Sequence, residues 1–318
     1  MRTLNLGTRP SHLARRQTEY VVAALCAAWP MLRAEVKVYT TQGDRELSRP
    51  LPEIGGKGLF TAEIEAALRV GEVDLAVHSF KDLPIAHSDG LVIGATLERE
   101  DARDVLVSRH RLSLMDLPPD PHVGTSSPRR AAQILAARPD ARIVPLRGNV
   151  DTRLHKAASD DYDALVLAAA GLTRLGLDKH ITQWLPFEIM LPAPAQGALA
   201  VQCRADDEAI LACLRPIHHP PTWAAVTAER AFLNGLGGGC AAPVAAYAVE
   251  CPSNEAGSPT LRLSGLIASL DGRQVIRVVA DGSPEEPERL GLRLAQEALD
   301  RGAGAMLRTR GGEICTTG

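Results

Sequence analysis

The sequence predicts an α/β protein with two lobes and a smaller α+β domain at its C-terminus. Up to about residue 201, short β-rich segments alternate with helical patterns, which indicates helices packed on mainly parallel sheets. Two crossings, the charged residues 98–104 and the proline-rich residues 192–197, divide this part of the chain. We therefore expect a cleft between two α/β lobes, with the charged crossing exposed to solvent. After residue 216 the pattern changes to that of a separate domain.

The elements of the two lobes follow from their periodicity and their end signals. Apolar residues at helical spacing predict a helix over residues 13–28, with Ser11 as its N-cap and Pro30 beyond its end. A second helix should begin at Pro128, directly behind the capping residue Ser127. Strands are expected at residues 4–7, 35–40, 74–78, 91–95, 105–108, 142–146, 164–168 and 198–203.

The C-terminal part predicts one sheet covered by helices. Helical spacing at residues 224–233 leads into a glycine-rich turn, and a closing helix stops at Gly302. Asp271-Gly272 is a strong hairpin signal between two strands. The expected strands are residues 244–249, 260–268 and 273–280.

Composition excludes several classes of function. The 318 residues carry 35 basic and 38 acidic groups, a net charge of −3, and only 3% are aromatic. A nucleic-acid binder would need a broad basic field or an aromatic stacking platform, so we expect no nucleic-acid partner. No apolar run is long enough to span a bilayer, and the first residues do not resemble a signal peptide. These features predict a cytoplasmic protein that does not contact the membrane.

The six cysteines show neither a C-x-x-C pair nor zinc-ligand spacing, so we expect reduced thiols and no metal. Most free cysteines are inert, buried residues, and this interpretation suits five of them. Cys240 is the exception, because it stands on the glycine-rich stretch 235–240. Its small neighbours leave the sulfur accessible for covalent attachment.

Arginines recur where a predicted strand ends and a helix begins. Arg9 occupies the first such place, Arg129 and Arg130 the second, and Arg147 with Arg153 the third. A helix N-terminus offers unpaired N–H groups, and arginine adds bidentate donors for carboxylate or phosphate. A single arginine of this kind more often packs over its own helix. Three such places in two lobes favour a polyanionic ligand in the cleft.

The glycine-rich stretch 55–58 is not a Walker A phosphate loop. Leu51 and Gly58 stand where that motif requires Gly and Ser or Thr. Two interpretations remain open for this stretch: it brings Lys57 to an anion, or it is an ordinary exposed connection.

Asp82 follows the apolar strand 74–78, at the carboxyl end where open α/β sheets place their ligand crevices. Its carboxylate could bind a substrate N–H group and stabilise developing positive charge. The alternative is a solvated loop ion beside Lys81. His78, within the strand, is better explained as a structural histidine than as a catalyst.

Taken in order, these motifs resemble the porphobilinogen deaminase family along essentially the whole chain. The matching blocks are Thr8-Arg9 with Ser11 and Gln17, residues 55–60, 76–82 and 124–127, Arg129-Arg130, residues 146–150 and 169–172, Gln196-Gly197, and residues 238–240. The resemblance implies two lobes like those of type II periplasmic binding proteins. Domain 1 would comprise residues 1–98 and 198–216, domain 2 residues 103–191, and domain 3 residues 220–318.

The resemblance also implies an activity. The family joins four porphobilinogen units, with loss of ammonia, into hydroxymethylbilane during tetrapyrrole and heme biosynthesis. Its dipyrromethane cofactor, built from substrate, would be attached to Cys240 through a thioether bond. The implied enzyme is a cytoplasmic, monomeric transferase.

Site residues carry over from the matching motifs. Asp82 matches the catalytic aspartate, which stabilises the cationic azafulvene left when ammonia departs. Implied cofactor contacts are Lys81, Asp82, Thr125, Ser126, Ser127, Arg129, Arg130, Arg147 and Gly148. Implied substrate contacts are Arg9, Ser11, Gln17, Lys57, Arg147, Arg153, Arg174 and Gln196. The chain departs from the family pattern at Glu53, Gly237 and Ala241-Ala242.

The main alternative is a two-lobed organic-anion binding protein or sensor without catalysis. A solute-binding protein of this kind would be expected to carry a signal peptide, and it gives no role to Cys240. A LysR-like regulator would need an N-terminal helix-turn-helix, which the sequence does not indicate. The enzyme hypothesis is therefore preferred.

Overall fold

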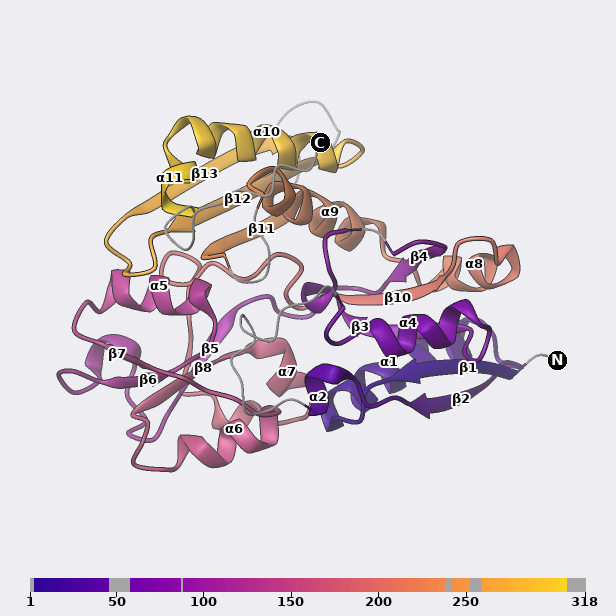
Figure 1. Cartoon of the computed structure of the whole chain (residues 1–318), viewed down its shortest axis with the longest axis horizontal. Helices are drawn as coiled ribbons and strands as arrows, with labels where there is room; N and C mark the ends of the chain where they lie inside the picture. The colour runs from indigo at the N-terminus through magenta and orange to yellow at the C-terminus, as the bar shows by residue number, and fades with distance from the viewer. Residues whose placement is uncertain (1–2, 46–57, 87, 238–241, 252–258, 308–318) are drawn as a thin grey trace.

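A computed structural model of the chain describes residues 3–45, 58–86, 88–237, 242–251 and 259–307. Two five-stranded sheets form two α/β lobes, and a three-stranded sheet with its helices forms a third unit that lies against both (Figure 1). The predicted architecture of two α/β lobes plus a small α+β unit is confirmed.

The first lobe is built on a sheet with strand order β2-β1-β3-β10-β4. Its strands are β1 (Thr3–Thr8), β2 (Arg33–Val38), β3 (Leu75–Ser79), β4 (Leu91–Thr96) and β10 (Leu199–Arg204). Its helices are α1 (His12–Ala28), α2 (Gln42–Arg45), α4 (Ala62–Arg69), α8 (Glu208–Leu214) and the 3₁₀ turn η1 (Phe80–Asp82). Strand β10 runs antiparallel to both of its neighbours, because the chain re-enters this lobe from the second crossing.

The second lobe repeats this plan with strand order β7-β6-β8-β5-β9. Its strands are β5 (Asp104–Ser108), β6 (His122–Gly124), β7 (Arg142–Val144), β8 (Ala164–Ala168) and β9 (Gln183–Trp184). Its helices are α5 (Pro128–Ala137), α6 (Val150–Ala157) and α7 (Ala169–Arg174). Strand β5 is antiparallel to β8 and β9, as β10 is to β3 and β4 in the first lobe. In each of these two sheets the other four strands run in one direction, so the expectation of mainly parallel strands is confirmed.

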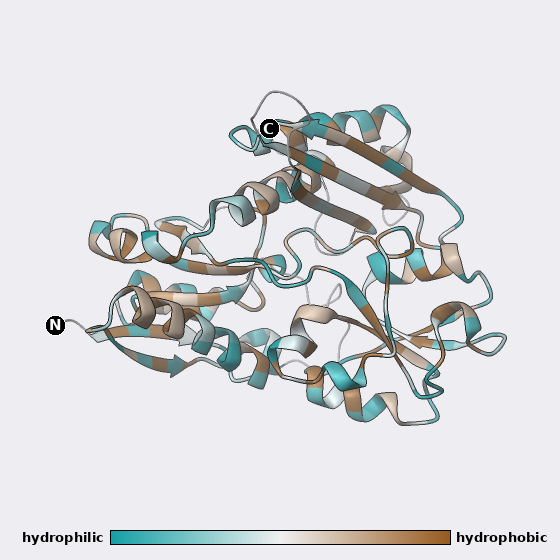
Figure 2. Cartoon of the chain, turned by 180° about the vertical axis from the view of Figure 1, so that it is seen from behind, coloured by the Kyte–Doolittle hydropathy of each residue, from teal (hydrophilic) through white to brown (hydrophobic). Residues whose placement is uncertain are grey.

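The third unit contains an antiparallel sheet, β11-β12-β13, with α9 and α10 packed against it. Its elements are α9 (Pro220–Gly235), β11 (Val244–Cys251), β12 (Thr260–Ala268), β13 (Val275–Gly282), α10 (Pro287–Asp300) and α11 (Ala303–Leu307). Phe232 is fully buried against Gly265, where an added Cβ would lie 2.4 Å from the ring. Figure 2 shows hydrophobic residues gathered on the strands, as the buried sheets require.

The two predicted helix caps are confirmed. The Ser11 hydroxyl accepts from the Ala14 N–H at 3.2 Å, and the Ser127 hydroxyl accepts from the Arg130 N–H at 3.5 Å. Helix α9 begins four residues earlier than predicted, because the His219 side chain caps it. Sequence reasoning missed this cap, since histidine is not a usual N-cap residue.

The prediction that the charged crossing 98–104 is solvated is wrong. Both guanidinium NH groups of Arg99 donate to the fully buried Glu229 on α9, at 2.6 and 3.0 Å. Asp104, at the end of the crossing, is also fully buried. The crossing is therefore joined to the third unit by a buried ion pair, Arg99–Glu229.

Candidate active site

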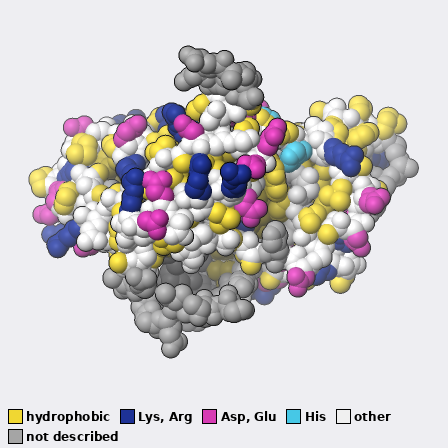
Figure 3. Space-filling view, turned by 90° about the horizontal axis from the view of Figure 1, so that it is seen from above, with side chains coloured by type: hydrophobic (Ala, Val, Ile, Leu, Met, Phe, Trp, Pro, Cys, Tyr) yellow, Lys and Arg dark blue, Asp and Glu magenta, His cyan; other side chains and the backbone are white. Residues whose placement is uncertain are grey.

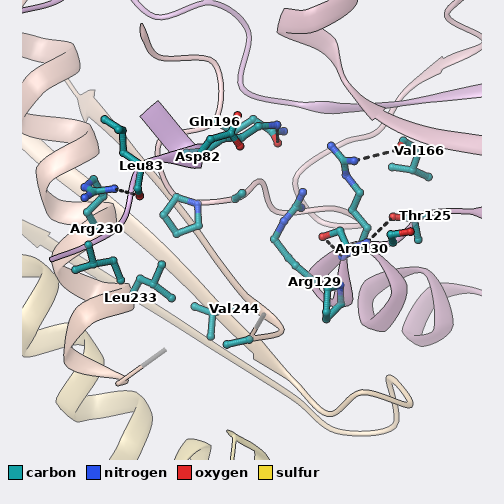
Figure 4. A pocket seen from close by; sticks show the side chains of 18 of the residues that line it. Asp82, Leu83, Thr125, Arg129, Arg130, Val166, Gln196, Arg230, Leu233 and Val244 are labelled. Carbon is teal, nitrogen blue, oxygen red and sulfur yellow. Dashed lines mark hydrogen bonds between the residues drawn. The ribbon is translucent and has the colours of Figure 1, made fainter. Parts of the chain in front are cut away.

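A cavity of about 330 Å³ lies where the two lobes meet the third unit (Figure 4). One wall is cationic and comes mainly from the lobes: Lys81, Arg129, Arg130 and Arg153. The opposite wall is apolar and includes residues of the third unit: Leu83, Ile85, Leu233, Ala242 and Val244. Such a cavity suits a ligand that carries both anionic groups and apolar rings.

Arg129 and Arg130 lie in the first turn of α5 and share one buried carboxylate. Arg129 Nη1 lies 2.7 Å from Asp104 Oδ2, while Arg130 donates to Asp104 Oδ1 from Nε at 3.1 Å and from Nη2 at 2.7 Å. Burial alone would raise the pKa of Asp104, but the two arginines hold it well below the usual range. Asp104 thus fixes the positions of both guanidinium groups in the cavity wall.

Gln196 extends this arrangement to the first lobe. Its Nε2 donates to Asp104 Oδ1 at 2.9 Å, and its Oε1 accepts from Lys81 Nζ at 3.2 Å. Burial, and after it the nearby Arg130, lowers the pKa of Lys81 to about 8. The Lys81 ammonium therefore begins to lose its proton just above neutral pH.

Asp82 ends the turn η1, directly after β3. Its side chain is exposed, and it lines the large cavity. It also lines a second, smaller cavity of about 20 Å³ in the first lobe. Asp82 consequently stands between two spaces, and this is the position at the carboxyl end of a strand that the sequence predicts.

The smaller cavity contains two of the predicted substrate contacts, Arg9 and Gln17. The Arg9 guanidinium pairs with Asp44 at 2.5 Å and lies 4.2 Å from the centre of the Phe60 ring. Gln17 Nε2 donates to the Ser79 hydroxyl at 2.9 Å. Both side chains are therefore oriented by protein partners before any ligand binds.

His78 lies in the wall of the same small cavity. Its Nε2 is 3.1 Å from Gln202 Oε1, and Gln202 in turn donates to Glu65 at 3.3 Å. Burial lowers the pKa of His78 to about 4, so its imidazole is neutral at pH 7. This agrees with the structural role expected from the sequence.

Three hydroxyl residues precede α5 and line the large cavity. Thr125 Oγ1 accepts from the Ser127 N–H at 3.2 Å. Ser126 Oγ donates to the Leu146 carbonyl at 3.0 Å and accepts from the Leu146 N–H at 2.9 Å. These bonds fix the turn that leads into the arginine-bearing helix.

The start of α6 contributes Arg153. Burial, followed by the proximity of Arg130, lowers the pKa of Arg153 to about 10. Its Nε donates to the Gly148 carbonyl at 2.8 Å. Gly148 has φ +116°, and an added Cβ would lie 2.7 Å from Thr152, so this position requires glycine. Arg147, beside it, is partly buried and does not line the large cavity.

Several predicted residues lie away from both cavities or outside the described residues. Ser11 caps α1, and the buried Arg174 donates from Nη2 to the Gly197 carbonyl at 2.6 Å, where it fastens the second crossing. Cys240, Lys57, Glu53 and Ala241 lie outside the described residues. Gly237, at the end of α9, has φ +62°, and Ala242 lines the large cavity. Leu233, before residues 238–241, and Ala242, after them, both line the large cavity.

Sequence reasoning missed two residues that shape the site, Asp104 and Arg230. Asp104 ends a charged run and directly precedes an apolar strand, and this placement was the available signal for burial. Arg230 lies on α9 and lines the large cavity. No local motif marks it, because its partners are about 150 positions earlier in the chain.

Two other features bear on the kind of protein. Within the described ranges, no group of three His, Cys, Asp or Glu side chains could hold a metal ion. In that same part of the chain, no helix is long and apolar enough to cross a membrane. On the face seen in Figure 3, acidic and basic side chains are interspersed.

Fold and cavity together define a two-lobed protein whose cationic cavity, beside an exposed aspartate, suits a carboxylate-rich ligand. A family model described as porphobilinogen deaminase, dipyrromethane cofactor binding domain, matches residues 4–212, and the model of the C-terminal domain of the same enzyme matches residues 223–300. The chain belongs to the porphobilinogen deaminase family. This membership confirms the predicted transferase activity, the polymerisation of porphobilinogen in tetrapyrrole biosynthesis, and the dipyrromethane cofactor.

Individual relatives agree over nearly their full length. The porphobilinogen deaminase of Brevibacillus brevis is 49% identical over 302 residues, which cover 95% of this chain and 96% of the relative. That of Moorella thermoacetica is 49% identical over 305 residues, covering 96% and 95%. Among solved structures, the BvgS VFT2 domain of Bordetella pertussis aligns at 16% identity over 68% of this chain and 86% of that one. Its TM-score is 0.40.

The residues of the large cavity fit the dipyrromethane cofactor. Two porphobilinogen-derived rings carry acetate and propionate groups, which suit the guanidinium groups and hydroxyls of the cationic wall. The apolar wall from Leu83 to Val244 suits the pyrrole rings. The acidic side chain among the lining residues, Asp82, can accept from pyrrole N–H groups.

Proposed function

We propose that Asp82 is the catalytic residue of porphobilinogen polymerisation in this chain. The observation that supports this most is its position: an exposed carboxylate between the large cationic cavity and the small cavity that contains Arg9 and Gln17. Asp82 binds the pyrrole N–H groups and stabilises the positive charge that develops on the substrate as ammonia leaves. Without a nearby anion, that cation would lie among Lys81 and several arginines.

The predicted site residues divide between cofactor and substrate. Dipyrromethane, attached to Cys240 through a thioether bond, would supply the free pyrrole carbon to which the first substrate unit is joined. Its carboxylates are bound by Lys81, Thr125, Ser126, Ser127, Arg129, Arg130, Arg147 and Gly148. Substrate carboxylates are bound by Arg9, Ser11, Gln17, Lys57, Arg147, Arg153, Arg174 and Gln196.

Two of these substrate contacts already have protein partners. Arg9 pairs with Asp44, and Arg174 donates to the Gly197 carbonyl. The N–H groups of Arg9 that face away from Asp44 can donate to a substrate carboxylate. Arg9 therefore binds substrate while its pair with Asp44 stays in place. Arg174, the last residue of α7, acts from beside the second crossing.

Domain boundaries and cellular setting complete the proposal. Domain 1 comprises residues 1–98 and 198–216, domain 2 residues 103–191, and domain 3 residues 220–318, which agrees with the strand membership of the three sheets. The enzyme acts in the cytoplasm as a monomer and binds no nucleic acid. The net charge of −3 and the mixed surface of Figure 3 support the last point.

Two measurements test this proposal. Intact mass spectrometry of the purified protein should give the sequence mass plus one dipyrromethane, and Cys240→Ser should lack the added mass. Porphobilinogen turnover by Asp82→Asn should fall about 10²–10³-fold, as when one preorganised electrostatic contact to the transition state is removed. Asp89→Asn, an exposed carboxylate after the same turn, is the matched control and should keep full turnover. Turnover by Asp82→Asn equal to that of the control would refute the role of Asp82.

A further inference from the structure

We propose that Arg230 is a positioning residue that holds the Asp82 turn on helix α9. The inference rests on the proposed role of Asp82 in catalysis. It assigns Arg230 to placing the carboxylate, rather than to binding ligand carboxylates as the other cavity arginines do.

Arg230 contacts the chain on both sides of Asp82. Its Nη1 donates to the Leu83 carbonyl at 3.1 Å, and its Nη2 donates to the Pro84 carbonyl at 2.5 Å. Its guanidinium carbon lies 5.1 Å from the centre of the Phe80 ring, before the catalytic residue. Figure 4 shows Arg230 reaching from α9 to Leu83, beside the labelled Asp82.

The turn needs such support because it is short and its functional side chain is exposed. η1 has three residues, and Asp82 is its last. An exposed carboxylate takes its position from the backbone beneath it, and the Leu83 N–H donates back to the Phe80 carbonyl at 3.2 Å within the turn. Arg230 adds bonds that leave the turn and reach another element, so it fixes the turn in space.

Arg230 ties the Asp82 turn to α9, the helix that precedes the cofactor cysteine, Cys240, in the chain. α9 ends at Gly235, and the chain re-enters the described part at Ala242, which lines the large cavity. α9 is itself anchored by Glu229, the residue before Arg230, which pairs with Arg99 of the crossing. Arg230 therefore couples the position of Asp82 to the unit that carries the cofactor.

The contacts of Arg230 favour a positioning role over the binding of ligand carboxylates. Both terminal nitrogens donate to backbone carbonyls, and the flat face lies over an aromatic ring. A carboxylate-binding arginine would affect KM when removed, whereas a positioning residue affects kcat. A displacement of about 1 Å in a reacting group lowers the rate about 10²-fold.

The experiment compares Arg230→Leu and Arg230→Lys with wild type, Asp82→Asn and a matched control. The control is Arg293→Leu, because Arg293 also donates to a backbone carbonyl, that of Asp281 at 2.7 Å, but on the exposed face of α10. Each protein is purified with its cofactor, its intact mass is recorded, and kcat and KM for porphobilinogen are measured per cofactor-loaded molecule.

We expect Arg230→Leu to keep the cofactor mass and a KM within threefold of wild type, while kcat falls about 10²-fold. Arg230→Lys should recover most of this loss, because an ammonium can still donate to the carbonyls and lie over Phe80. If Arg230→Leu does not fold, the Lys variant decides the question through a smaller loss confined to kcat. A kcat like that of the control, a change mainly in KM, or loss of the cofactor mass would each overturn the proposal. A low rate in wild type, or a normal rate in Asp82→Asn, would instead refute the proposed function.

Discussion

Replacing Asp104 with Asn should strongly destabilise the second lobe. The wild-type carboxylate is fully buried and meets two arginines and Gln196, with four contacts between 2.7 and 3.1 Å. An asparagine keeps one acceptor oxygen for Arg130 but turns a donor toward Arg129. Removing one partner of a buried ion pair in this way costs about 3–5 kcal/mol. A unit of about 60–100 residues, such as this lobe, loses about 4–8 °C of melting temperature per kcal/mol, so we expect its transition to fall by roughly 12–40 °C.

Asp281→Asn is the matched control for this prediction. Asp281 also receives two bonds from one arginine, Arg262, at 2.8 and 2.9 Å, but both side chains are about half exposed. A surface pair contributes about 0–1 kcal/mol, so the control should melt within a few degrees of wild type. Scanning calorimetry on both variants gives the comparison. Equal melting temperatures for Asp104→Asn and the control would refute the reasoning.

The pairing of Asp104 with the two arginines also predicts how the stability of the protein depends on pH. The pKa of Asp104 is held below its usual value by the arginines, so its contribution to stability is fully present above about pH 4, the pKa in the unfolded chain. That contribution is lost as the pH falls through the lower pKa of the folded state. The stability gap between wild type and Asp104→Asn should therefore be constant from pH 5 to 7 and narrow in more acidic buffer. A gap that widens on acidification would contradict this assignment.

Three further substitutions test other parts of the site. Glu229→Gln should lower the free energy of unfolding by about 3–5 kcal/mol, because Glu229 binds Arg99 and the N–H groups of two other segments. In calorimetry the third unit should then unfold in a separate transition, and a single unchanged transition would contradict this. Gly148→Ala should raise KM and lower the free energy of unfolding by about 1–3 kcal/mol, because φ is +116° and the new Cβ would clash with Thr152. An unchanged KM and an unchanged stability would contradict this prediction. Because the pKa of Lys81 is about 8, kcat/KM should decrease above pH 8 as the ammonium loses its charge. Lys81→Arg should remove that decrease, and identical pH profiles for wild type and Lys81→Arg would exclude Lys81 as the cause.

Local features of this chain were predictable, and long-range charge pairing was not. Ser11 and Ser127 cap helices as expected, because a cap depends only on the next three residues. Arg99 looks like part of a solvated charge run, yet its partner Glu229 lies 130 positions later. Arg9 was expected to be available for substrate, and its pairing with Asp44 depends on how α2 folds back beside β1. Composition counts such charges but does not indicate which of them meet.

Charge pairing also explains how a nearly neutral chain can build a cationic site. The net charge is −3, yet five of the residues lining the large cavity are Lys or Arg, against one aspartate. Concentrating cations in a partly buried space is unfavourable unless their charge is balanced. Asp104 balances part of it from behind the wall, while Arg230 directs its N–H groups to backbone carbonyls. The remaining positive charge faces the cavity and can be balanced by ligand carboxylates, so binding a carboxylate-rich ligand relieves a repulsion that the fold itself maintains.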